Sequence, residues 1–177
     1  MDYWHTLKND RGILKKTAFT VLGIIIGFAF ARFFFTSYKI TDNSMEPEFK
    51  KNKTVIVLKL FKPAVGDAVL ITNPVDEDKV LLKRIAAAED DVIEIRAKNI
   101  TINGKNIEPN KNRNYSDPRV FPVNFSQRDN MPSVKLKRNE YFLLGDNLDM
   151  SFDSREFGQI NKKNIIGKTI YIVNFFN

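Results

Sequence analysis

The chain has 177 residues, of which 43% are hydrophobic and 28% are charged, and its net charge is +7. This length suits one domain with an appendage, and the composition excludes a disordered chain. Because the sequence contains no cysteine, a disulfide framework, a thiolate nucleophile and a cysteine-ligated zinc site are all excluded.

The first predicted element is an apolar helix over residues 17–35. Residues 17–31 carry no charge, and three phenylalanines follow Arg32. As a helix the segment would be about 28 Å long at roughly 1.5 Å per residue, close to the roughly 30 Å hydrocarbon core of a bilayer. We interpret it as a transmembrane helix, preceded by a cytoplasmic segment, 1–16, and followed by an extracytoplasmic β domain, 36–177.

Two alternatives to an anchor stay open. Ala29-Phe30-Ala31 has the small-x-small pattern of a cleavage site, so the run could be a cleaved signal peptide, and it could also be a buried core helix. Four basic residues precede the run. Basic residues also follow it, but long translocated domains count little in the positive-inside rule, so we place the N-terminus in the cytoplasm.

After residue 53 the sequence changes to short runs rich in β-branched residues, separated by turn residues. Asn103-Gly104 predicts a tight hairpin within 99–107, because both residues tolerate the positive φ of a type I′ turn. Residues 108–139 contain four prolines and no clear periodicity, and we expect an irregular insertion there. The fold class is therefore mainly β, antiparallel, with one N-terminal helix. Strands are predicted at 54–60, 68–72, 80–86, 92–96, 141–144 and 165–173.

The single histidine, His5, precedes the apolar run. If that run crosses a membrane, no histidine shares a compartment with the β domain. A Ser-His-Asp triad and a histidine metal site are then excluded, and a general base has to be Asp, Glu, Lys or Tyr. We predict no metal and no cofactor.

Two places could carry chemistry without histidine. The segment 145–158 reads GDNLDMSFDSREFG and lies between two predicted strands. It is either a solvated loop with Asx turns or a site held by the strands that flank it. A second candidate is Ser44, in a Ser-Met-Glu-Pro stretch just beyond the apolar run, which could equally be a turn before the first strand.

Lys83 is a candidate base for Ser44. Alternation along the strand places Lys83 on the same face as Leu81 and Ile85, although a strand lysine more often faces solvent. Burial would lower its pKa from about 10.4, and a base active near neutrality needs a fall of roughly 2.5 units, or about 3.4 kcal/mol. A neutral amine could then take the proton of Ser44 as its oxygen attacks a carbonyl.

The motifs, in their order, resemble those of bacterial type I signal peptidases, which are membrane-anchored serine proteases with a Ser-Lys dyad. Ser-Met-Glu-Pro at Ser44 resembles the nucleophile box, and Gly66-Asp67-Ala68-Val69 resembles a Gly-Asp strand. Lys83-Arg84 with Asp91 resembles the lysine box. The segment 145–158 resembles the Gly-Asp-Asn…Ser-x-Asp-Ser-Arg…Gly box, which is the most specific of the four.

The resemblance implies roles for individual residues. Ser44 would be the nucleophile, with its backbone N–H in the oxyanion hole, and Lys83 the general base. Ser151 would orient the lysine, and Met45 would pack below the nucleophile and line the substrate side. The supporting residues implied are Asp146 and Asn147 in the loop, the ion pair Asp153–Arg155, and Arg84 beside the lysine.

Some positions depart from the family pattern. Two residues before the nucleophile, where some members have a hydroxyl that serves as a second oxyanion donor, this chain has Asp42, and an ionised carboxylate cannot donate. Thr41 is a neighbouring hydroxyl without an assigned role. Ala87-Ala88-Glu89-Asp90-Asp91 replaces a Gly-Leu-Pro-Gly-Asp-like turn, and Leu148 and Met150 replace polar residues.

The resemblance implies an endopeptidase of the bacterial plasma membrane that cleaves signal peptides from exported preproteins after Ala-x-Ala. Its partners would be preproteins and membrane phospholipid, and the positive net charge agrees with binding to anionic lipid. The protein translocation channel is a further candidate partner. We do not expect the chain to bind nucleic acid. Two alternatives are a membrane-tethered β module that only binds a partner, and a self-cleaving Ser-Lys protease.

Overall fold

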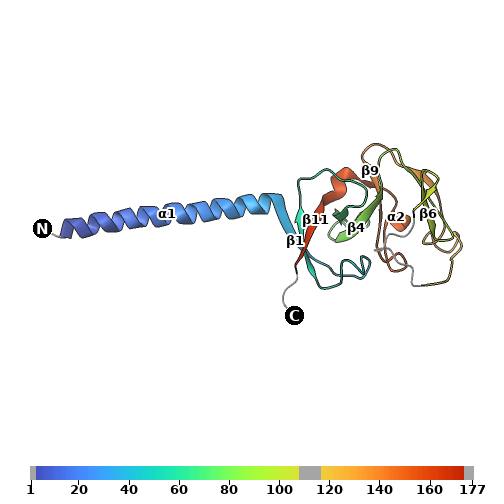
Figure 1. Cartoon of the computed structure of the whole chain (residues 1–177), viewed down its shortest axis with the longest axis horizontal. Coiled ribbons are helices and arrows are strands. Elements are labelled where there is room, and N and C mark those ends of the chain that lie inside the picture. Colours follow the sequence, from blue (N-terminus) through green and yellow to red (C-terminus); the bar gives the residue numbers. More distant parts are fainter. Residues whose placement is uncertain (1–2, 108–116, 174–177) are drawn as a thin grey trace. The chain divides into compact units, whose positions relative to one another are not determined.

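The computed structural model describes residues 3–107 and 117–173, with side chains from residue 12 onward (Figure 1). The chain divides into two compact units, Met1–Thr36 and Ser37–Asn177. The first unit is dominated by a helix and the second by antiparallel strands, which confirms the predicted fold class.

Helix α1 (Tyr3–Phe34) begins earlier than the predicted helix and ends one residue sooner, because Phe35 opens strand β1 (Phe35–Lys39). Its part Gly12–Phe34 is long and apolar enough to cross a membrane, a test that an N-terminal signal sequence would also meet. The apolar window has no buried share within the structure.

The larger sheet has the strand order β1-β2-β11-β3-β4-β9-β10. Each strand pair whose register is determined in it is antiparallel. Strand β4 lies between β3 and β9, where Val69 pairs with Lys83 and Leu144 pairs with Arg84. The remaining bounds are β2 (Thr54–Leu58), β3 (Ala68–Thr72), β4 (Val80–Ala87), β9 (Glu140–Leu144), β10 (Ile160–Asn161) and β11 (Ile165–Val173).

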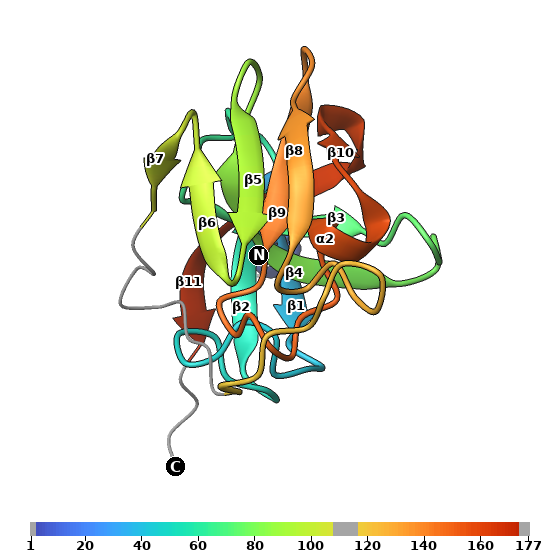
Figure 2. The ribbon, with the colours of Figure 1, turned by 90° about the vertical axis from the view of Figure 1, so that its right-hand side faces the viewer.

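A second sheet has the order β7-β6-β5-β8, and Figure 2 shows β6, β5 and β8 side by side. The turn between β6 and β7 has φ of 52° at Asn103 and 73° at Gly104, which confirms the predicted Asn-Gly hairpin. The bounds are β5 (Val92–Arg96), β6 (Asn99–Ile102), β7 (Lys105–Asn106) and β8 (Met131–Lys135).

Strand β8 corrects the prediction that 108–139 is irregular throughout. It pairs with β5, placing Met131 opposite Ile95 and Lys135 opposite Val92. Pro132 lies in β8 and lacks a backbone donor, but β8 is an edge strand, where a proline N atom can face away from the ladder. The proline that argued against a strand therefore indicates an edge position. Residues 108–116 lie outside the described residues.

Strand β3 is buried on both faces. Ala68 and Leu70 belong to an apolar cluster that includes Met45, whereas Val69 and Ile71 belong to another that includes Ile85 on β4. Burying a larger aliphatic side chain such as Val69, Leu70 or Ile71 stabilises the fold by roughly 1.5–3 kcal/mol. Strand β4 is therefore held between well-packed neighbours, which fixes the positions of its two consecutive basic residues.

Candidate active site

Ser44 lies in the turn that follows β1, and 2% of its surface is exposed. The turn is held from both sides of the serine. On one side, Met45 is completely buried, and its carbonyl accepts the N–H of Phe49 at 2.9 Å. On the other side, the carbonyl of Ser44 accepts the N–H of Asn147 at 2.9 Å. These bonds place the Ser44 hydroxyl at a fixed position against the 145–158 segment.

Lys83 reaches this serine from β4. Its side-chain Nζ lies 2.5 Å from Ser44 Oγ, and only 1% of the residue is exposed, as the strand alternation predicts. Burial lowers the pKa of Lys83 below its ordinary value, because an ammonium loses hydration in the interior. The nearby carboxylates of Asp42 and Asp153 act in the opposite direction but do not cancel the effect.

Asp42 also contacts the serine, an arrangement that the sequence analysis did not predict. One carboxylate oxygen, Oδ1, accepts the Ser44 hydroxyl at 2.7 Å and the Ser44 backbone N–H at 2.9 Å. The signal available in the sequence was the spacing, because an aspartate commonly accepts the N–H of the residue two positions later. Thr41 bonds instead to the hydroxyl of Tyr38 at 3.2 Å.

Arg84, the next residue on β4, has a separate set of partners. Its Nε and Nη2 bond the two carboxylate oxygens of Asp146 at 2.8 and 2.6 Å. It also bonds Glu48 at 2.9 Å and the Gly66 carbonyl at 2.8 Å. Burial alone would lower the pKa of Arg84, but the bonds to Asp146 and Glu48 raise it overall. Arg84 therefore remains charged and ties β4 to the loop after β9.

Gly145 lets that loop approach Ser44 closely. A β carbon at Gly145 would lie 2.5 Å from the Ser44 carbonyl oxygen and 2.3 Å from Ser151 Oγ. The backbone N–H of Gly145 bonds Asp153 at 3.0 Å. No larger residue could occupy this position without moving Ser44.

Ser151 lies beside Gly145, and its Oγ is buried without a hydrogen-bond partner. It is near enough to Asp153 to contribute to the lowered pKa of that carboxyl, although the two groups do not have hydrogen-bond geometry. The structure therefore brings Ser151 to the site but does not form the predicted bond from Ser151 to Lys83.

Asp153 and Arg155 form a fully buried ion pair at 2.9 Å. Asp153 also caps the short helix α2 (Ser154–Phe157) by accepting the Arg155 N–H, and Arg155 bonds the Leu148 carbonyl at 2.7 Å. Burial alone would raise the pKa of Asp153, but Arg155 lowers it overall. The pair and its bonds hold the 145–158 segment in shape.

Met45 lies at the site but faces inward. It is completely buried in the apolar cluster with Ile40 and Phe49, so in this structure it offers no surface to a substrate. Contact between Met45 and a substrate, as the resemblance implies, would require the turn to move. Among the described residues there is no group of three or more acidic or histidine side chains that could hold a metal ion.

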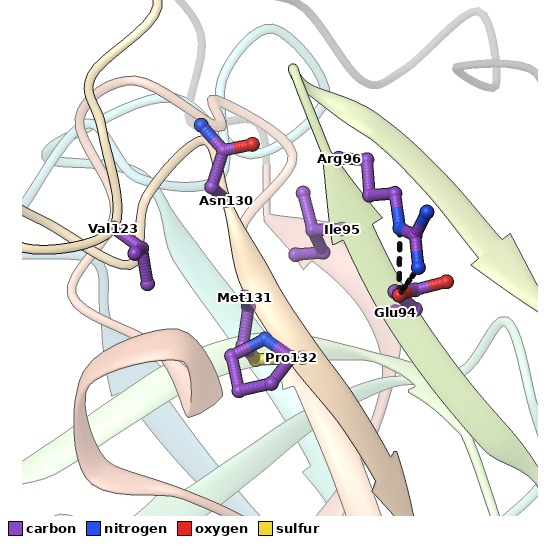
Figure 3. Close-up of a pocket in the computed structure, with 7 residues that line it drawn as sticks. All are labelled: Glu94, Ile95, Arg96, Val123, Asn130, Met131 and Pro132. Atoms are coloured by element: carbon purple, nitrogen blue, oxygen red, sulfur yellow. Dashed lines mark hydrogen bonds and ion pairs between the residues drawn. The ribbon is translucent and has the colours of Figure 1, made fainter.

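A separate hollow of about 440 Å³ lies over the paired strands β5 and β8, and Val123 also lines it (Figure 3). Figure 3 shows Arg96 bonded to Glu94 at one side of it. None of the candidate catalytic residues lines this hollow. The lining residues are Glu94, Ile95, Arg96, Val123, Asn130, Met131 and Pro132.

Comparison with known proteins adds an independent line of evidence. Residues 13–174 match the family model described as signal peptidase, peptidase S26. Signal peptidase I V of Bacillus subtilis (strain 168) is 32% identical over 154 residues, covering 83% of this chain and 90% of that protein. Signal peptidase IB of Staphylococcus aureus (strain COL) is 29% identical over 170 residues, covering 90% and 88%.

A solved signal peptidase I from Enterococcus faecalis V583 superposes with a TM-score of 0.48 at 21% identity, covering 62% of this chain and 97% of that one. The family model and the Bacillus relative each span most of the chain. The chain therefore belongs to the signal peptidase family, peptidase S26, and is a type I signal peptidase, an enzyme that cleaves signal peptides.

Proposed function

We propose that this protein is a membrane-anchored serine endopeptidase in which Ser44 is the nucleophile and Lys83 the general base. One observation carries the proposal: two buried side chains from distant parts of the sequence place Nζ and Oγ 2.5 Å apart. A buried lysine with a lowered pKa, in contact with a serine hydroxyl, is the pairing that serine catalysis without histidine requires.

The neighbourhood of Lys83 favours an uncharged amine. The adjacent Arg84 is bonded to the carboxylates of Asp146 and Glu48, and Asp153 is bonded to Arg155. These carboxylates already have cationic partners, so they attract the Lys83 ammonium less than free carboxylates would. Desolvation is then the largest influence on Lys83, and it favours the neutral amine that can accept a proton.

In the proposed acylation step, Ser44 Oγ bonds to the scissile carbonyl carbon while its proton passes to Lys83 Nζ. The carbonyl oxygen becomes an oxyanion, and the backbone N–H of Ser44 donates to it. The carbon–nitrogen bond then breaks, and Lys83 returns the proton to the leaving amine. Water then attacks the acyl carbon with Lys83 again as base, the ester bond to Ser44 Oγ breaks, and Lys83 returns the proton to Oγ as the new carboxyl terminus leaves. General-base catalysis of this kind contributes about 10²–10⁴-fold.

Cleavage after small residues, in the Ala-x-Ala pattern, is part of the proposal. Ser44 is 2% exposed, so a scissile bond reaches Oγ only if the side chain beside it is small. A set of signal peptides that differ only in the residue before the cut would test this. We expect cleavage after Ala to exceed cleavage after Leu or Phe by at least about tenfold, which corresponds to roughly 1.4 kcal/mol.

We further propose that α1 anchors the enzyme in the plasma membrane, with the N-terminus cytoplasmic and the β unit outside. Exposed apolar side chains along Gly12–Phe34, including Phe19, Ile24 and Phe28, support contact with lipid. Anionic phospholipid and the translocation channel are the proposed neighbours. Protease protection in sealed cells and inverted vesicles would test the orientation, because the β unit should be digested only from outside.

The decisive experiment uses purified full-length protein in detergent with an added signal-peptide substrate. Ser44→Ala and Lys83→Ala should each lower cleavage at least about 10³-fold, because each removes one member of the pair. Ser133→Ala and Lys135→Ala change the same residue types at exposed positions on β8 and should cleave normally. Normal cleavage by either active-site variant would refute the proposal.

The same assay separates the two alternatives from the proposed function. A pure binding module would leave the substrate intact and would not be labelled at Ser44 by a serine-reactive acylating probe. A self-cleaving protease would shorten its own chain, which mass spectrometry detects, without turning over the added substrate. Membership in the signal peptidase family supports cleavage in trans.

A further inference from the structure

The carboxylate of Asp42 uses one oxygen to hold two hydrogens of the same residue. Oδ1 accepts the Ser44 hydroxyl at 2.7 Å and the Ser44 backbone N–H at 2.9 Å. Both of these groups have a function in the proposed reaction: the hydroxyl attacks the carbonyl carbon, and the N–H stabilises the oxyanion.

The hydroxyl bond points the reactive proton away from the base. A serine hydroxyl has one hydrogen, and here it is donated to Asp42. Lys83 Nζ, 2.5 Å from the same oxygen, is then a donor to Ser44 Oγ rather than the acceptor of its proton. The two atoms are at the right distance for proton transfer, but the proton is on the wrong side of the oxygen.

The backbone bond occupies the oxyanion donor. An oxyanion hole works because its donors are already aimed at the position where negative charge develops. In this structure a carboxylate accepts the Ser44 N–H. A substrate carbonyl that approached it would meet the Asp42 oxygen, and the developing oxyanion would be repelled by a second negative charge.

We propose that Asp42 is a latch on the nucleophile: its carboxylate holds Ser44 in a resting arrangement and has to move away before the serine can attack. The inference rests on the proposed roles of Ser44 and Lys83 and concerns the control of that site. Asp42 is only half-buried, so its carboxylate can turn toward water when a signal peptide enters.

Release of the latch requires little rearrangement elsewhere. The Ser44 hydrogen turns toward Lys83, whose Nζ is already within bonding distance. The carbonyl of Ser44 stays bonded to the Asn147 N–H. Ser151 Oγ is buried beside Gly145 without a hydrogen-bond partner, so it is available to form a new hydrogen bond within the site after release. Only the side chain of Asp42 and one hydroxyl rotor need to move.

The latch also acts on the base through its charge. Asp42 raises the pKa of Lys83, in the same direction as Asp153 and Asp146, whereas Arg155 lowers it and burial lowers it most. Removing the Asp42 charge should therefore lower the pKa of Lys83. More of the lysine would be neutral at a given pH, and the acid limb of the rate profile would move to lower pH.

The test compares Asp42→Ala and Asp42→Asn with the natural enzyme, using full-length protein in detergent. Alanine removes the acceptor, and asparagine keeps the size and turn-forming ability of the side chain while removing its charge. Asp78→Asn, the same change at an exposed position between β3 and β4, is the matched control. The measurements are kcat/KM on a signal peptide, the rate of Ser44 acylation by a serine-reactive probe, the pH profile and Tm.

If about nine-tenths of the free enzyme is latched, Asp42→Ala should gain on the order of tenfold in kcat/KM and in acylation rate. Asp42→Asn should gain less, because its amide oxygen can still accept the Ser44 hydrogens. The acid limb should also move to lower pH, while Asp78→Asn changes neither. An unchanged rate or a lower rate in Asp42→Ala with unaltered Tm would overturn the latch. Full activity of Ser44→Ala would instead overturn the proposed function, so the two failures are distinguishable.

Discussion

Gly145 lies so close to Ser44 that a β carbon on the glycine would be 2.5 Å from the serine carbonyl oxygen. That oxygen belongs to the backbone and is held by the N–H of Asn147, so it cannot yield as a flexible side chain would. The close approach brings the loop after β9 to Ser44, the nucleophile that we propose. It also makes the loop sensitive to the smallest possible substitution.

Gly145→Ala should therefore reduce cleavage by about 10–100-fold, because displacing a catalytic group by about 1 Å is enough for such a loss. The measurement is kcat/KM of the folded enzyme. The matched control is Gly167→Ala, whose β carbon would lie 2.6 Å from the Leu58 carbonyl oxygen, between β11 and β2. That variant should lose stability but keep kcat/KM per folded molecule; equal losses of kcat/KM in both would contradict the prediction.

The pH dependence of cleavage should follow the protonation of Lys83. Burial lowers its pKa, and the protonated form cannot act as a base, so activity should fall as the pH decreases through this lowered value. A kcat/KM profile from pH 5 to 10 measures it. Loss of activity only on the alkaline side would contradict the assignment of Lys83 as base.

The same pKa shift predicts an effect on stability. Between the lowered folded value and the ordinary unfolded value, the unfolded chain binds more protons at Lys83 than the folded chain does. The free energy of unfolding should therefore rise with pH across this window. Lys83→Met removes the titrating amine and should flatten this part of the curve measured by urea denaturation. An equal slope in both proteins would exclude the effect.

Breaking the pair Asp153–Arg155 should destabilise the β unit strongly. Both side chains are fully buried, so Arg155→Met leaves Asp153 unpaired, at a cost of about 3–5 kcal/mol. Because the folded pKa of Asp153 is lowered, the stability it contributes is present above its unfolded pKa and is lost as the pH falls through the folded one. Urea denaturation at two pH values measures both effects. Asp76→Asn, which breaks an exposed pair with Lys79, should change little.

Substitution by alanine should affect stability differently at two buried serines, Ser154 and Ser151. Ser154 Oγ accepts the Leu143 N–H at 2.9 Å, so Ser154→Ala should cost about 1–3 kcal/mol by leaving that donor unpaired. Ser151 Oγ has no hydrogen-bond partner, so Ser151→Ala should change Tm much less than Ser154→Ala does. A lower cleavage rate in Ser151→Ala at unchanged Tm would then report on its proposed orienting role, whereas a marked loss of Tm would contradict the structure.

The sequence predicted most of the strands because their signal is local. Alternating and continuous apolar runs located β2, β3, β4, β5, β9 and β11, and Asn103-Gly104 located the hairpin. Strand β8 was missed because Pro132 argues against a strand unless its edge position is known, and that position depends on pairing with β5. Strand β1 was missed because its phenylalanine continues the apolar run of the helix.

The candidate site could be predicted as a set of residues but not as a geometry. The spacing of the motifs and the alternation on β4 indicated Ser44 and Lys83, and the burial of Lys83 followed from the alternation. The double contact of Asp42 with Ser44 depends on a turn conformation that residue type alone does not fix. The missing bond of Ser151 likewise depends on atomic positions.

Lys83 and Arg84 are neighbours on one strand, so their side chains point to opposite faces of the sheet. The site therefore depends on the exact register of β4. A strand that slips by one residue turns every side chain to the opposite face. A one-residue deletion just before Lys83 would bring a guanidinium opposite the hydroxyl, a group that stays protonated at any pH an organism tolerates. Such a protein would keep its net charge, yet Lys83, the base that we propose, would no longer face Ser44.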